Sequence, residues 1–214
     1  TEALMPSFAF AASAQCAVWN GLAPVFVDVD DHHWHLDPDA LEAALDTRQG
    51  RVAVVIALSS FGVPPPPAVR ERWQSLCREA GVPLIVDSAA GFGATAADGV
   101  PIGAQGDVEV VSFHALKPVS AGEGGAVFCR DEALARRVKD LVNFTFDEDH
   151  QVQSARGLNA KTESSTRNRS VAVTGPACSA TKRGCNCSPR RWMPAYVICA
   201  SGKRWVYISL TCLA

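Results

Sequence analysis

Short apolar segments alternate with amphipathic segments along the first three quarters of the 214-residue chain. Residues 52–58 (VAVVIAL) form a continuous apolar run, which is typical of a strand buried on both faces. Residues 68–80 then show the spacing of an amphipathic helix that Gly81 would close. This alternation predicts the α/β fold class, a three-layer sandwich around a mostly parallel sheet. We expect the remaining strands at residues 24–29, 83–87, 108–113 and 125–129, and the remaining helices at 131–142 and at 36–45, the latter capped by Asp37.

The ends of two predicted strands carry polar side chains that can serve a ligand. Asp87 ends the strand at 83–87, whereas Ser112 and Lys117 lie at and just beyond the strand at 108–113. In open parallel sheets, ligands bind beyond the carboxyl ends of the strands. We therefore expect these three residues to lie at the edge of the sheet where a small molecule binds.

The composition is that of an ordinary soluble globular protein, with 48% hydrophobic and 20% charged residues. A formal net charge of -2 gives no reason to expect nucleic acid or an anionic membrane as a partner. No stretch approaches the roughly 18 to 20 apolar residues that a membrane span needs. The first residues lack the basic and apolar regions of a signal peptide, so we expect a cytoplasmic protein, with sequence missing upstream of Thr1.

The composition changes after Lys161. Residues 162–214 are rich in serine, threonine, arginine and cysteine, and Glu163 is their one acidic residue. We interpret them as an atypical tail outside a partial domain at residues 1–161, either shifted in reading frame or disordered; a small basic module is the alternative. The tail cysteines lack the paired C-x2-C spacing of a zinc site, and no histidine accompanies them. Three further cysteines lie beside apolar segments and are predicted to be core thiols: Cys16, Cys77 and Cys129.

A lysine and a glycine-rich turn follow the predicted strand at 108–113. The segment from Ser112 to Gly125 reads SFHALKPVSAGEGG and contains Lys117. An amine near a buried strand end is partly desolvated, which lowers its pKa and makes it nucleophilic toward an aldehyde. By spacing alone, however, an ordinary surface lysine in a loop is the simpler interpretation. The glycines match neither the phosphate loop G-x-x-x-x-G-K-[ST] nor the dinucleotide fingerprint G-x-G-x-x-G.

Asp87 ends an apolar strand and is followed by small residues, in the segment VDSAAGFGA at 86–94. A carboxylate in this position can face the nitrogen of a bound pyridine ring and keep it protonated, so that the ring withdraws electrons. Taken alone, the same aspartate can equally cap the N-terminus of a helix. The functional interpretation therefore requires Asp87 and Lys117 to contact the same ligand.

Together, these two segments resemble the DegT/DnrJ/StrS family of pyridoxal-phosphate-dependent sugar aminotransferases, which have the aspartate-aminotransferase fold. Asp87, the spacing from Ser112 to Lys117 and the following GEGG turn carry the resemblance. Four further motifs follow the order found in the family: PSFAFAA at 6–12, GLAPVFVDV at 21–29, LDP at 36–38 and GLNAK at 157–161. The resemblance covers roughly residues 5 to 161, and it implies an incomplete large domain that binds pyridoxal 5'-phosphate.

The resemblance also implies roles for the residues around the lysine. Lys117 corresponds to the lysine that binds the cofactor as a Schiff base and moves the catalytic proton. Asp87 corresponds to the partner of the ring nitrogen, and Ser112 to a hydroxyl donor to the cofactor phosphate. His114 lies beside the lysine, where it is either a group on the substrate side or an ordinary packed histidine.

The resemblance also implies cofactor contacts for two residues that do not lie at the strand ends. Phe10 corresponds to the aromatic residue that stacks on the cofactor ring, with a buried core aromatic as the alternative. Asn159 corresponds to an asparagine that reaches the phosphate of the neighbouring subunit, so the resemblance implies a homodimer. One position departs from the family, which usually has glutamine three residues after the aspartate. Here Ala90 occupies that position, so that contact with the cofactor is absent or comes from another residue.

The activity implied is transfer of an amino group from an amino acid, such as glutamate, to a nucleotide-linked keto-sugar. The family also includes pyridoxal-phosphate-dependent sugar dehydratases, in which a histidine replaces the catalytic base, but this chain keeps Lys117. A catalytically inactive fragment or a non-enzymatic remnant of the family is a further alternative. A Rossmann-type oxidoreductase is disfavoured, because no glycine fingerprint follows the first strand.

A histidine cluster is the remaining candidate for chemistry. His32, His33 and His35 surround Trp34, with aspartates close by in the sequence. This combination can suggest a metal ion, but we favour a solvated loop between a strand and a helix. No metal site is therefore predicted.

Overall fold

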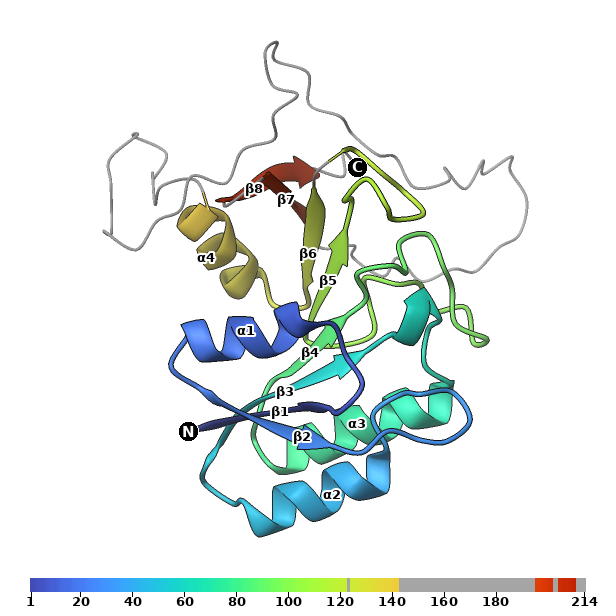
Figure 1. The fold of residues 1–214 in the computed structure, drawn as a ribbon, viewed down its shortest axis with the longest axis vertical. Coiled ribbons are helices and arrows are strands. Elements are labelled where there is room, and N and C mark those ends of the chain that lie inside the picture. The colour runs from blue at the N-terminus through green and yellow to red at the C-terminus, as the bar shows by residue number, and fades with distance from the viewer. Residues whose placement is uncertain (123, 143–194, 202–203, 211–214) are drawn as a thin grey trace, which may run out of the picture.

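The computed structural model of the protein describes residues 1–122, 124–142, 195–201 and 204–210 (Figure 1). Its strands are β1 (Glu2–Pro6), β2 (Ala23–Val27), β3 (Val52–Leu58), β4 (Leu84–Asp87), β5 (Val108–Ser112), β6 (Gly125–Cys129), β7 (Ala195–Ser201) and β8 (Arg204–Leu210). Its helices are α1 (Ala11–Trp19), α2 (Pro38–Thr47), α3 (Pro67–Glu79) and α4 (Glu132–Val142), with a 3₁₀ turn at Ser60–Gly62.

The strands form one sheet in the order β2-β1-β3-β4-β5-β6-β7-β8. Strands β1 to β5 pair in parallel, whereas β6, β7 and β8 pair antiparallel to their neighbours. The predicted α/β class with a mostly parallel sheet is therefore confirmed. Asp87 lies opposite Leu58 of β3 and Val110 of β5, so the carboxyl ends of β3, β4 and β5 meet at one edge of the sheet.

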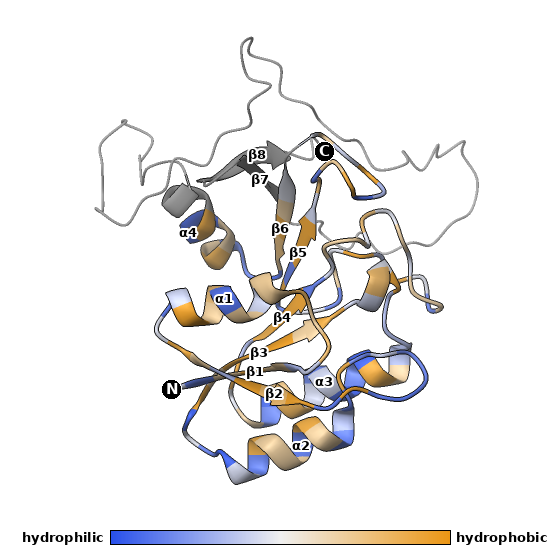
Figure 2. Ribbon diagram, viewed as in Figure 1, coloured by the Kyte–Doolittle hydropathy of each residue, from blue (hydrophilic) through white to orange (hydrophobic). Residues whose placement is uncertain are grey.

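Helices cover both faces of this sheet (Figure 1). Successive residues of a strand point to opposite faces, and the core divides in the same way. On one face, α2 and α3 pack against strand residues that include Val55 and Val86. On the other face, α1 packs against Ile56 and Ile85, and α4 packs against β5 and β6. Figure 2 shows the consequence in the colours of β1, β3 and β4, which are hydrophobic along most of their length.

Most predicted elements are found within one or two residues of their expected bounds. Strand β1 and helix α1 were not predicted from the sequence, nor were β7 and β8 in the tail. Helix α1 is rich in alanine and has hardly any separation of polar and apolar faces, so its sequence lacks the periodicity that reveals α3. Cys77 and Cys129 are buried as predicted, but the prediction was wrong for Cys16, which is exposed on α1.

The tail contributes two strands to the described part of the chain. β7 lies beside β6, with Val127 opposite Tyr196, and β8 lies beside β7. The other residues of the tail, and Asn159, lie outside the described residues, so the domain boundary at residue 161 stays a prediction. Within the described ranges, no helix combines the length and the apolar character that crossing a bilayer requires.

The N-cap predicted for α2 is present. The Asp37 carboxylate accepts hydrogen bonds from the backbone N–H groups of Asp39 at 2.8 Å and Ala40 at 3.1 Å, and Pro38 occupies the first helical position. We expect Asp37→Ala to lower the free energy of unfolding by about 1 kcal/mol, because these two donors lose their partner. Urea denaturation would measure the change, with Asp46→Ala in the last turn of the same helix as the control. Equal midpoints for the two variants would contradict the assignment.

Candidate functional site

Asp87 is held in place by donors from two different elements. Its Oδ2 accepts a hydrogen bond from the Ser13 hydroxyl of α1 at 2.7 Å, and its Oδ1 accepts one from the backbone N–H of Ala89 at 3.1 Å. The alternation of side chains along β4 explains the contact with Ser13. Asp87 points to the same face of the sheet as Ile85, and α1 covers that face. A carboxylate has about four acceptor positions, so Asp87 can still accept from another donor. Asp87 is therefore not a helix N-cap but a carboxylate held in place at the carboxyl edge of the sheet.

Ser112 lies at the same edge, on the neighbouring strand. Asp87 pairs with Val110, and Ser112 is two residues further along β5, so both side chains point to one face of the sheet. The Ser112 hydroxyl accepts from the backbone N–H of His114 at 3.2 Å and contacts the Gly124 carbonyl oxygen at 3.5 Å. The second contact is long, so the hydroxyl hydrogen is available to a better acceptor such as a phosphate oxygen.

Lys117 lies in a loop that closes immediately beyond β5. The backbone N–H of Ala121 donates to the carbonyl oxygen of Phe113 at 2.9 Å. The backbone N–H of Lys117 donates to the carbonyl oxygen of His114, also at 2.9 Å. The side chain of Lys117 is half-buried, as is that of His114, whose Nδ1 accepts from the backbone N–H of Leu116 at 3.2 Å. The choice between a group on the substrate side and an ordinary packed histidine therefore stays open for His114. The placement of the lysine amine toward a shared ligand stays a prediction.

Phe10 precedes α1 at the carboxyl end of β1. Its side chain is 80% exposed, so the alternative of a buried core aromatic is wrong. The carbonyl oxygen of Phe10 accepts a hydrogen bond from the backbone N–H of Ser13 at 3.1 Å. The hydroxyl of the same serine contacts Asp87. An apolar ring face thus lies uncovered within the described residues, on the same helix end that holds the carboxylate.

A buried polar network below this edge was not found from the sequence. Glu109 is 1% exposed, and its Oε1 accepts from the Ser88 hydroxyl at 2.5 Å. Its Oε2 accepts from the backbone N–H groups of Gly103 at 2.6 Å and Gln105 at 2.8 Å, which holds the long loop between β4 and β5. Burial raises the pKa of Glu109, and the three donors oppose this effect. The alternation of side chains along β5 was the sequence signal that could have revealed this network. It places Glu109 on the face of the sheet opposite to that of Ser112.

The position that departs from the family adjoins the 3₁₀ turn after β3. Gly62 has a positive φ of 84°, and a Cβ atom there would lie 2.3 Å from the carbonyl oxygen of Ala90. The backbone therefore passes Ala90 so closely that only glycine fits at position 62. The contact that glutamine makes in the family has no replacement visible at Ala90 itself.

The histidine loop differs in part from the prediction of a solvated loop. His32 and His33 are exposed, but His35 is fully buried, and its Nδ1 lies 3.2 Å from the Leu58 carbonyl oxygen. Burial lowers the pKa of His35, which favours the neutral form of the ring. The Asp30 carboxylate accepts from the backbone N–H groups of all three histidines. Among the residues that the structure describes, no three metal-binding side chains gather at one point.

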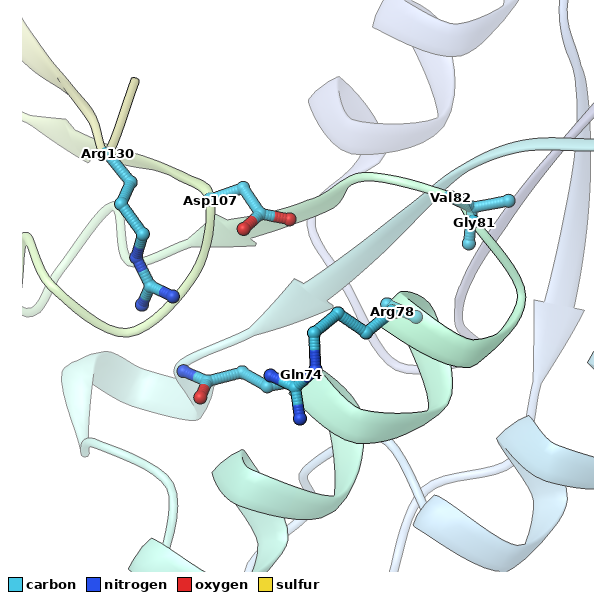
Figure 3. A pocket seen from close by; sticks show the side chains of 7 residues that line it. Gln74, Arg78, Gly81, Val82, Asp107 and Arg130 are labelled. Carbon is cyan, nitrogen blue, oxygen red and sulfur yellow. The ribbon is translucent and has the colours of Figure 1, made fainter. Parts of the chain in front are cut away.

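A cavity of about 280 Å³ lies away from the candidate site (Figure 3). Gly81 and Val82 line it just before β4, and Asp107 lines it just before β5. Arg78 of α3 and Arg130, which follows the antiparallel β6, complete its charged wall. These positions belong to the amino ends of the parallel strands, so the cavity and the candidate site lie at opposite edges of the sheet.

Comparison with known proteins identifies the family. The sequence profile of the DegT/DnrJ/EryC1/StrS aminotransferase family matches residues 1–165. The chain belongs to this family. Among solved structures, it is similar to DesI, which was crystallised in the presence of its TDP-sugar product, with a TM-score of 0.62 and 41% identity over 69% of this chain and 36% of that chain.

Two curated relatives extend the comparison. Protein Rv3402c of Mycobacterium tuberculosis (strain ATCC 25618 / H37Rv) is 40% identical over 141 residues, which are 66% of this chain and 34% of that protein. The L-glutamine:2-deoxy-scyllo-inosose aminotransferase of Streptomyces lividus is 36% identical over 140 residues, which are 65% of this chain and 31% of that enzyme. The chain thus spans about a third of the length of the curated relatives it matches.

The residues present in this family member fit pyridoxal phosphate. The acceptor capacity left on Asp87 suits a protonated ring nitrogen, and the exposed face of Phe10 suits an aromatic ring. The Ser112 hydroxyl suits a phosphate oxygen. All three lie at the carboxyl edge of the sheet, where a ligand is expected in this architecture.

Proposed function

We propose that residues 1–161 are part of the cofactor-binding domain of an aminotransferase that uses pyridoxal phosphate and acts on a nucleotide-linked keto-sugar. The observation that carries the proposal is the Asp87 carboxylate, fixed by Ser13 at the end of β4 and followed on the next strand by the Lys117 loop. A fixed carboxylate beside an amine-bearing loop serves a cofactor with an aldehyde and a ring nitrogen.

The proposed roles are those that the family resemblance implies for the residues at these positions. When bound, pyridoxal phosphate supplies an aldehyde for covalent attachment of an amine and a ring that withdraws electrons. The amine of Lys117 would hold the cofactor at this aldehyde and then carry the proton at the substrate carbon. The Asp87 carboxylate would hold a proton on the ring nitrogen, and the Ser112 hydroxyl would donate to the phosphate. Phe10 would exclude water from one face of the ring.

His114 and Asn159 complete the proposed assignment. His114 begins the loop that carries Lys117, and we place it on the substrate side of the lysine. Asn159 would reach the phosphate bound by a second copy of the chain, so a homodimer is part of the proposal. Light scattering would measure the oligomeric state directly. The cytoplasm, expected from the sequence, stays the predicted compartment.

Two relatives favour different sugar-like acceptors. DesI was crystallised in the presence of its TDP-sugar product, which supports a nucleotide-linked ketone for this chain. The Streptomyces lividus enzyme acts on 2-deoxy-scyllo-inosose and uses L-glutamine, which supports a free cyclic polyol ketone as the second candidate. The retained Lys117 argues against a dehydratase for either acceptor.

A direct assay distinguishes the proposals. The protein is incubated with pyridoxal phosphate, L-glutamate or L-glutamine, and either a TDP-linked keto-hexose or 2-deoxy-scyllo-inosose. We expect an amino-sugar product with the nucleotide-linked ketone, detected by mass spectrometry, together with the 2-oxo acid formed from the donor. An aminated polyol alone would favour the second candidate. Absence of cofactor binding would show that the chain is the inactive remnant considered above.

A further inference from the structure

The first turn of α1 connects two residues that the proposed cofactor site needs. The backbone N–H of Ser13 donates to the carbonyl oxygen of Phe10 at 3.1 Å, and the hydroxyl of Ser13 donates to Asp87 at 2.7 Å. One residue thus contacts both the predicted stacking residue and the predicted partner of the ring nitrogen. Phe10 precedes α1 and Asp87 ends β4, so β2 and β3 lie between them in the sequence. No local sequence pattern therefore links the two residues.

The surroundings of Ser13 favour a stable contact. The residue is 6% exposed, so water competes little for its hydroxyl. On the next turn, the thiol of Cys16 donates to the carbonyl oxygen of Ser13 at 3.0 Å. Although the residue as a whole is exposed, partial desolvation of its thiol raises the pKa of Cys16, and the negative charge of Asp87 raises it further. Both observations place the inner face of α1 against the carboxylate.

Among the hydrogen bonds of the described residues, the one from Ser13 is the only one that joins the Asp87 carboxylate to another helix or strand. The other donor, the N–H of Ala89, is only two residues away and moves with the same strand end. Loss of the Ser13 hydroxyl would therefore remove the hydrogen bond that ties the carboxylate to α1, although α1 would still pack against Ile85 of β4. A donor to a carboxylate also favours its charged form, so this hydroxyl affects where a shared proton resides.

We propose that Ser13 is a positioning residue that fixes Asp87 against the cofactor ring nitrogen and sets the place of Phe10 relative to it. The inference rests on the proposed function, because it concerns the same cofactor. With the hydroxyl present, the carboxylate stays charged and the shared proton stays on the ring nitrogen. Without it, the proton shifts toward Asp87, and the ring loses part of its capacity to withdraw electrons.

The test compares side chains of similar shape with and without a hydroxyl. Ser13→Thr keeps the donor, whereas Ser13→Val has nearly the same volume as threonine and lacks it. Ser75→Ala is a matched control, because Ser75 also lies on a helix and donates to a carboxylate, Glu79 Oε1 at 2.9 Å, on an exposed surface. Circular dichroism confirms that each variant is folded before binding is measured.

Two readouts are measured with pyridoxal phosphate labelled with ¹⁵N in the ring. Titration gives the dissociation constant, which we expect to rise about 10-fold in Ser13→Val and to remain near the wild-type value in Ser13→Thr and Ser75→Ala. The ¹⁵N resonance reports protonation of the ring nitrogen, and a purely structural role of Ser13 would leave it unchanged. We expect it to move toward the unprotonated value in Ser13→Val alone.

The outcomes separate the inference from the proposed function. If the wild-type chain binds the cofactor and Ser13→Val matches Ser13→Thr in both readouts, the role of Ser13 is overturned while the proposed function stands. If the wild-type chain fails to bind pyridoxal phosphate, the proposed function fails and the inference fails with it. If Ser13→Val does not fold, the same comparison is made between Ser13→Thr and Ser13→Ala.

Discussion

Lys117→Ala is expected to abolish covalent attachment of pyridoxal phosphate and to lower the rate of amino transfer by at least about 10³-fold. The lysine is the one residue of the proposed site that offers an amine to the cofactor aldehyde, and no other side chain of the closed loop at 113–121 can replace it. The same amine moves the proton at the substrate carbon, so the variant loses attachment and proton transfer together. This is the largest effect that we expect from any single substitution.

The measurement uses borohydride, which makes the linkage between cofactor and lysine permanent. After reduction and proteolysis, mass spectrometry should find the added cofactor mass on the peptide that contains Lys117, and absorption near the visible edge should change. Lys139→Ala in α4 is the control and should keep both signals. Labelling of another lysine in the wild-type chain, or an unchanged spectrum in Lys117→Ala, would contradict the assignment.

Asp87→Asn is expected to lower the rate of amino transfer by about 10²- to 10³-fold while the chain remains folded. Asparagine has nearly the same shape and can still accept from the Ser13 hydroxyl, so the contact between β4 and α1 is largely kept. The negative charge is lost, however, and a neutral amide cannot keep a proton on the ring nitrogen. The ring then withdraws electrons less well when the substrate carbon loses its proton.

The effect of this substitution belongs to the catalytic rate rather than to substrate binding. We therefore expect kcat to fall with little change in KM, measured by steady-state kinetics with the amino donor varied. Asp46→Asn, an exposed change at the end of α2, serves as the control and should leave both constants unchanged. Equal kcat values for Asp87→Asn and the wild type would remove Asp87 from the site.

The elements with clear periodicity were predicted well from the sequence. The apolar run of β3 was found at its observed bounds, and Asp37 with Pro38 marked the start of α2. Helix α1 was missed because its small residues give neither a stripe of large apolar side chains nor a polar N-cap. Yet α1 contributes Ser13, so the missed helix supplies the contact that fixes the best-placed residue of the candidate site.

The roles of the two acidic residues in β4 and β5 could not be distinguished from the sequence around them. Asp87 and Glu109 both lie in apolar strands, and nothing local distinguishes a carboxylate that serves a ligand from one that holds a loop. Their faces of the sheet differ, and the register between β4 and β5 decides which face each occupies. The long loop then closes over Glu109 through three donors, whereas Asp87 keeps acceptor positions at the open edge.

By itself, the sequence determined the five strands between residues 24 and 129, the residues that end them and the resemblance to an aminotransferase family. These follow from patterns of neighbouring residues, whose spacing reports burial and turns directly. Only the tertiary structure decided that Ser13 meets Asp87 across 74 residues, that Phe10 is exposed and that His35 is buried. Such contacts depend on which faces pack together, and packing is a property of the assembled sheet rather than of any single segment.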